Sequence, residues 1–169
     1  MFNPIIHHAY FSNTEFATTT AVDIDATNAA VQDLVRPIKY HFTATTTETS
    51  EFSFSISAKG TFYVDWGDGK VEKIEKANTT NTTYSHTYDA AGVYDVRFAG
   101  RATGYTSAAA ISFVDNLNLA GIDGSLGRIF STLASGANPT FSSVFSGCTN
   151  LADTIPEELF DGVSGQMVY

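Results

Sequence analysis

A short turn rich in glycine and aspartate constrains this chain more than any other feature. The run Thr61-Phe62-Tyr63-Val64 leads into Asp65-Trp66-Gly67-Asp68-Gly69, and a polar run, Lys70–Lys76, leaves it. Asp-Gly between two extended runs predicts a tight hairpin, because glycine supplies the positive φ that such a turn requires. We expect Asp65 and Asp68 to accept backbone hydrogen bonds in this turn, and Trp66, the only tryptophan, to anchor a small core beside it.

From Ile38 onward the apolar residues recur at every second position. Tyr40, Phe42 and Ala44 alternate with polar residues, and Phe52, Phe54 and Ile56 do the same. This alternation predicts strands with one face on a core and the other in water. The predicted strands are 38–46, 51–58, 61–66, 70–76, 83–88, 92–99 and 107–114, with turns between them that include 89–92 and 100–104. Turn signals at intervals of about 8 to 12 residues are typical of a β-sandwich.

Two further motifs follow the hairpin in a fixed order. They are Tyr84-Ser85-His86-Thr87-Tyr88 and Ala91-Gly92-Val93-Tyr94-Asp95-Val96. The succession W-G-D-G, H-T-Y and G-x-Y-x-V resembles the PKD family, which implies an immunoglobulin-like β-sandwich over residues 38–115. We expect His86 to be a buried, hydrogen-bonded structural residue, because no partner for catalysis accompanies it. The predicted structural residues of the turn and core are Asp65, Trp66, Gly67, Asp68, Gly69, His86, Tyr88, Gly92 and Tyr94.

After about Asp115 the pattern changes to one of repeats. The pairs Ile129-Phe130 and Leu159-Phe160 lie 30 positions apart, a spacing in the range of solenoid repeats. Residues 145–165 contain the motif F-x-G-C-T-N-L followed by I-P-x-x-L-F-x-G-x-S-G. This pair of motifs resembles the BspA-type leucine-rich repeats of bacterial surface proteins. That resemblance implies a short α/β solenoid over 116–169, with Leu151 and Ile155 in its core, Asn150 bonded to backbone groups and Cys148 a small buried filler. Pro156 suits the first position of a short helix.

Residues 1–37 have no clear period and form a separate N-terminal arm or extension in this interpretation. Thr27–Val35 is mildly amphipathic and predicts a short helix that Pro37 ends. The adjacent His7 and His8 would point to opposite faces of a strand, so they are poorly placed to chelate one ion. The segment either packs on another subunit or is a locally docked terminus.

Composition and charge exclude several function classes. A net charge of −9 argues against nucleic acid, because phosphates would be repelled, and no run has the length of a transmembrane helix. No secretory leader pattern follows Met1, so the chain is exported by another route, lacks its leader here, or is assembled inside a cell. A single cysteine excludes an internal disulfide framework. No nucleophile elbow, phosphate-binding loop or zinc motif is present, so we predict no enzyme and no cofactor.

Three aspartates in or near the turn are the candidates for a calcium site. Asp65, Asp68 and Asp89 offer the oxygen atoms that hard cations require, but aspartates beside glycines are more often simple turn formers. We therefore predict no metal site, with these three residues as the candidates if calcium binds.

The sequence favours a non-enzymatic extracellular structural or binding module of a bacterial surface, similar to an adhesin. The alternative is an assembly subunit of a virion, as a decoration or fibre protein, or of a surface filament. One or two repeats cannot bury their apolar faces alone, so we expect a protein partner, either another copy or a neighbouring structural subunit. The predicted interaction face is Ile155, Leu159, Phe160 and Val163, with Phe2, Ile5, Ile6 and Phe11 of a neighbour's arm as a candidate cover.

Overall fold

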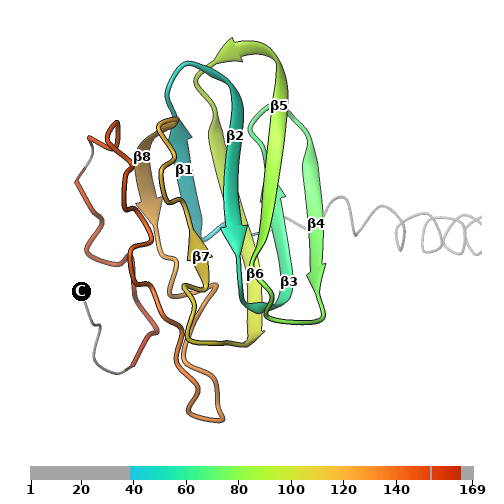
Figure 1. Ribbon diagram of the computed structural model, residues 1–169, viewed down its shortest axis with the longest axis vertical. Coiled ribbons are helices and arrows are strands. Elements are labelled where there is room, and N and C mark those ends of the chain that lie inside the picture. The colour runs from blue at the N-terminus through green and yellow to red at the C-terminus, as the bar shows by residue number, and fades with distance from the viewer. Residues whose placement is uncertain (1–38, 153, 165–169) are drawn as a thin grey trace, which may run out of the picture. The chain divides into compact units, whose positions relative to one another are not determined.

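The computed structural model describes residues 39–152 and 154–164. The chain divides into two units, 1–38 and 39–169, and all the described residues belong to the second. Within them eight strands form two antiparallel sheets, and no helix is present (Figure 1). The strands are β1 (Phe42–Thr46), β2 (Thr49–Ile56), β3 (Lys59–Asp65), β4 (Val71–Lys76), β5 (Thr82–Gly92), β6 (Asp95–Gly104), β7 (Ile111–Ser112) and β8 (Leu119–Gly124). The prediction of a mainly β fold is confirmed.

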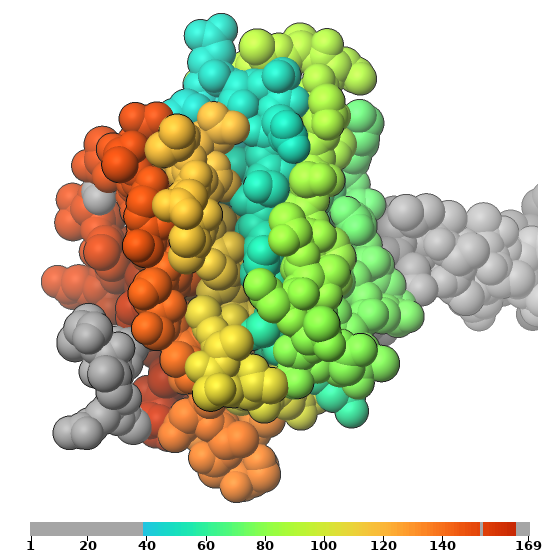
Figure 2. All heavy atoms as spheres, viewed as in Figure 1, coloured from blue at the N-terminus to red at the C-terminus, as the bar shows by residue number. Residues whose placement is uncertain are grey.

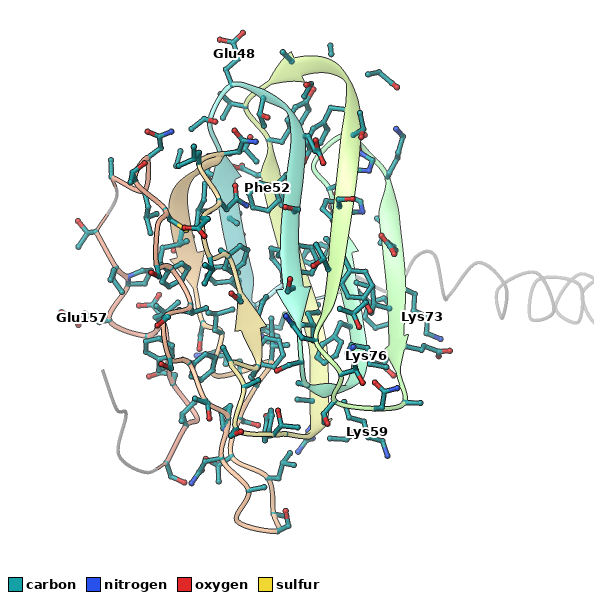
Figure 3. The ribbon with its side chains drawn as sticks, viewed as in Figure 1. Glu48, Phe52, Lys59, Lys73, Lys76 and Glu157 are labelled. Carbon is teal, nitrogen blue, oxygen red and sulfur yellow. The ribbon has the colours of Figure 1, made fainter. Side chains whose placement is uncertain are left out.

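The two sheets pack face to face across one core. The larger has the order β4-β3-β6-β1-β8 and the smaller β5-β2-β7. Inward positions of both sheets alternate with outward ones, as in Phe42 and Ala44 on β1 of the larger sheet and Phe52 and Phe54 on β2 of the smaller. Figure 3 shows Phe52 of β2 pointing between the sheets. The alternating pattern of the sequence is therefore the pattern of burial.

Two predicted turns are wrong. Residues 89–92 continue β5 to Gly92, and residues 100–104 continue β6 to Gly104. Gly100 has a φ of 122°, and a side chain there would collide with the Thr61 carbonyl of β3. In this strand glycine allows two backbones to approach closely. In the sequence alone, the same glycine is a turn signal.

The segment after residue 115 adds a strand to the larger sheet. Strand β8 pairs with β1, with Ala44 opposite Ile122. The next residues, including Leu126, Ile129 and Phe130, are buried in the same hydrophobic cluster as Phe62 and Phe98. Residues 39–169 form one compact unit, with no division at 115.

The described residues after β8 form a coil of successive turns. The helix expected after Pro156 is absent, because the backbone forms separate turns in which Leu159 donates to Pro156 and Asp161 to Glu158. The predicted α/β character of this segment is therefore wrong for the described residues. Figure 2 shows these C-terminal residues, in orange to red, packed along one side of the sandwich.

Candidate functional site

The hairpin between β3 and β4 carries an aromatic cluster. Trp66 is buried, and its ring stacks on His86 with ring centroids 4.9 Å apart. Tyr88 donates its hydroxyl to the Trp66 carbonyl at 3.0 Å and stacks on Tyr94 at 3.7 Å. Burial, followed by the charge of Asp68, raises the pKa of Tyr88 well above its usual value. The three motifs of the sequence thus meet in one packed cluster of rings.

Two aspartates close the turn through hydrogen bonds to the backbone. Asp65 accepts from the N–H of Gly67, and Asp68 accepts from the N–H of Lys70, each at 3.0 Å. Asp68 Oδ2 also lies 2.8 Å from His86 Nε2; a carboxylate can only accept, so Nε2 carries the proton. Burial alone would raise the pKa of Asp68, but the hydrogen bonds from His86 and Lys70 outweigh it and lower that pKa below its usual value.

The three calcium candidates pair with cationic side chains. Asp68 and Asp89 share Lys70, whose Nζ lies 3.3 Å and 3.8 Å from their carboxylates, and Asp65 lies 3.7 Å from Arg97. Within the described residues, no group of three or more His, Cys, Asp or Glu side chains is placed to hold a metal ion. These aspartates stabilise the turn through hydrogen bonds and ion pairs, and they are not grouped as metal ligands in the part of the chain that the structure describes.

The C-terminal coil stacks on the segment before it in a regular way. Hydrogen bonds run from Ala110 to Thr140, Phe113 to Val144 and Asp115 to Ser146, and further along from Gly127 to Leu159. All of these pairs lie about 30 residues apart, the spacing of the sequence repeat. Residues 109–132 and 140–164 are therefore two successive coils, the first of which is also part of the sandwich.

Two residues of the repeat motif hold the coils together. Asn150 donates its side-chain amide to the Leu117 carbonyl at 2.7 Å, and Cys148 is buried with its Sγ 2.9 Å from the Phe113 carbonyl. Burial raises the pKa of the Cys148 thiol, so this sulfur is a packing group. Leu151 is half-buried against the core.

The predicted interaction face is only partly a surface. Leu159 is 1% exposed and belongs to the chain's own core, so its assignment to the face is wrong. Phe160 is half-buried against Phe141, with ring centroids 4.8 Å apart, and Val163 is also half-buried. Ile155, which the repeat resemblance placed in the solenoid core, is 56% exposed. Of the four residues predicted for this part of the face, only Ile155 is fully a surface residue.

The rest of the predicted face lies in the N-terminal unit. Phe2, Ile5, Ile6 and Phe11, the helix expected at 27–35 and the pair His7-His8 are outside the described residues. Among the residues that are described, no helix has the length and hydropathy needed to cross a bilayer.

Sequence reasoning missed a group of cations on the larger sheet. Lys59, Lys73, Lys76 and Arg101 border one depression on β3, β4 and β6, together with Tyr63. These residues are spread over more than 40 positions, and only the pairing of β4 with β3 and of β3 with β6 brings them together. The only related signal in the sequence is that lysine and arginine are few, nine against eighteen acidic residues, and this count does not show that four of the nine lie together.

Comparisons with protein-family models, with curated proteins and with solved structures found no match for this chain.

Proposed function

We propose that this protein is a non-enzymatic extracellular module of a bacterial surface, built as a PKD-like sandwich that runs into BspA-type coils. The sandwich acts as a rigid spacer, and the coils extend or present a surface. The observation that carries the proposal is the ladder of hydrogen bonds between coils about 30 residues apart, built directly onto the sandwich. The cluster of Trp66, His86, Tyr88 and Tyr94 supports the PKD-like half of it.

Location is tested by immunogold labelling of intact source cells and particles, read by negative-stain electron microscopy. Antibodies against the purified chain should decorate the cell surface. Label confined to the cell interior would overturn the proposal. Label on viral particles or on filaments would establish the alternative, an assembly subunit.

One observation favours that alternative. Ile155 is exposed on the last coil, where Phe160 and Val163 are only half-buried, and exposed apolar surface marks contact with another protein. As an assembly subunit, the chain would bury this surface against a second copy.

Sedimentation velocity over a wide range of concentrations tests this association. We expect the wild-type chain to self-associate and Ile155→Asp to remain a monomer. Val93→Asp is the matched control, because Val93 is also an exposed apolar residue, at 64%, but lies between β5 and β6 away from the coil. A monomeric wild type at high concentration would exclude self-assembly through the coil.

A further inference from the structure

The outer face of the larger sheet has a cationic depression of about 900 Å³. Its lining comes from β3, β4 and β6 and consists of Lys59, Gly60, Thr61, Tyr63, Lys73, Glu75, Lys76, Ala77, Gly100, Arg101 and Thr103. Figure 3 shows Lys59, Lys73 and Lys76 near one end of this sheet. The depression is wide and open to solvent, which suits one side of an extended ligand better than a single ion.

The charge of this lining opposes that of the chain. Four of the nine lysines and arginines border the depression, against one carboxylate, Glu75, in a chain of net charge −9. Lys73 pairs with Glu75 at 3.0 Å, whereas Lys59 and Arg101 make no ion pair with a carboxylate in the part of the chain that the structure describes. A local concentration of positive charge in a concave surface attracts anions to that surface.

Protection of a sheet edge does not account for this arrangement. Lysines on an edge strand prevent unwanted pairing, and Lys73 and Lys76 are on the edge strand β4. Lys76 is further committed to structure, because its Nζ donates to the Thr80 carbonyl and the Thr82 hydroxyl, both at 2.8 Å. Arg101, however, is on β6, an interior strand where no edge needs protection.

The remaining groups of the lining suit a sugar. Thr61 and Thr103 supply hydroxyls, Glu75 supplies an acceptor, and Tyr63 supplies an aromatic ring with a polar tip. Gly60 and Gly100 have no side chains and lie where β3 and β6 approach closely. The lining therefore combines hydrogen-bond donors and acceptors, one aromatic ring and excess positive charge.

We propose that this depression binds an acidic polysaccharide, one that carries carboxylate or sulfate groups, with Arg101 and Lys59 contacting the anionic groups and Tyr63 packing against a sugar ring. The negative charge of the rest of the chain repels every long polyanion alike, so the preference for a saccharide over nucleic acid rests on the hydroxyl groups, the acceptor and the single aromatic ring of the lining. The proposal stands on the sheet alone and does not depend on the role of the coil or on cellular location.

Isothermal titration calorimetry of the full chain at low salt tests it with four probes. These are oligogalacturonate, which carries only carboxylates, a heparin-derived hexasaccharide, which carries sulfates as well, neutral cellohexaose, and a single-stranded DNA oligomer. We expect binding of at least one acidic saccharide, weakened by added salt, and no binding of the neutral one. The first two probes distinguish carboxylate from sulfate recognition. DNA binding as tight as that of the acidic saccharides would overturn the assignment to a saccharide.

Variants distinguish the depression from the general charge of the protein. Arg101→Glu should weaken binding at least tenfold, and Tyr63→Ala should weaken it without changing its salt dependence. Arg97→Glu is the matched control, because Arg97 is equally an exposed arginine of β6 but lies opposite Asp65, outside the lining of the depression. Thermal melts should show that all three variants remain folded. Equal losses for Arg101→Glu and Arg97→Glu, or no binding of either acidic saccharide by the wild type, would overturn the proposal.

Discussion

Asp68 joins the backbone of its own turn to the aromatic cluster. It accepts from the Lys70 N–H and lies against His86, whose ring stacks on Trp66. We predict that Asp68→Ala lowers the free energy of unfolding by about 1–3 kcal/mol, because it leaves donors without acceptors. Chemical denaturation measures this effect. Asp89→Ala is the control, since Asp89 is almost fully exposed, and equal stability of the two variants would contradict the role given to Asp68.

The contribution of Asp68 should depend on pH. Its pKa is lowered in the folded state, so the ionised carboxylate stabilises the fold at pH values above its unfolded pKa, about 3.8. That stabilisation is lost as the pH falls through the folded pKa. We expect the difference in stability between wild type and Asp68→Asn to be full near neutral pH and to shrink below about pH 4. A difference that stays constant down to pH 2 would contradict the linkage.

Calcium should leave the protein unchanged. The carboxylates of Asp65, Asp68 and Asp89 already pair with Arg97 or Lys70. A ligand raises the melting temperature only if it binds the native state. Scanning calorimetry with millimolar calcium and then EDTA checks this prediction. A rise in melting temperature that EDTA reverses would show that a site forms.

At the scale of elements, the last coil has a buried side and an exposed side. We predict that Leu159→Ala costs about 2–5 kcal/mol, because it opens a cavity in the core, whereas Ile155→Ala changes stability by no more than about 0.5 kcal/mol. Denaturant titrations of the two variants measure the contrast. Similar values for both would mean that the coil is not docked on the sandwich.

The elements also show how far sequence reasoning reaches. The β3–β4 hairpin could be predicted, because its signals, Asp-Gly and the flanking alternation, are local. Strand β8 could not be placed, because its partner β1 is more than 70 residues away and leucines at strand spacing suit a repeat equally well. Leu159 was misassigned for a related reason: the pattern identified an apolar residue but not the neighbour that covers it. The cationic depression depends on strand order, which no local pattern encodes.

At the scale of the whole molecule, sandwich and coils share one hydrophobic core. Leu126, Phe130, Val144 and Leu159 belong to the same cluster as the sandwich residues. We therefore predict that a chain of residues 39–115 does not fold cooperatively, while 39–169 does. Near-ultraviolet circular dichroism and thermal melts compare the two. A sharp transition in the shorter chain would establish an autonomous sandwich.

The coil also determines where the protein is open to unwanted aggregation. Strand β8 is an edge of the larger sheet and β7 is an edge of the smaller sheet. The coil forms hydrogen bonds to β8 and to the residues beside β7, so both of these edges already have a neighbour. The other pair consists of β4, which has four charged residues, and β5, whose outward positions include Thr83, Ser85 and Thr87. Charge protects β4 from pairing with foreign strands, whereas β5, whose eleven residues include only one carboxylate, Asp89, is less protected. Amyloid-like growth of this protein would therefore begin at β5 and proceed in one direction only.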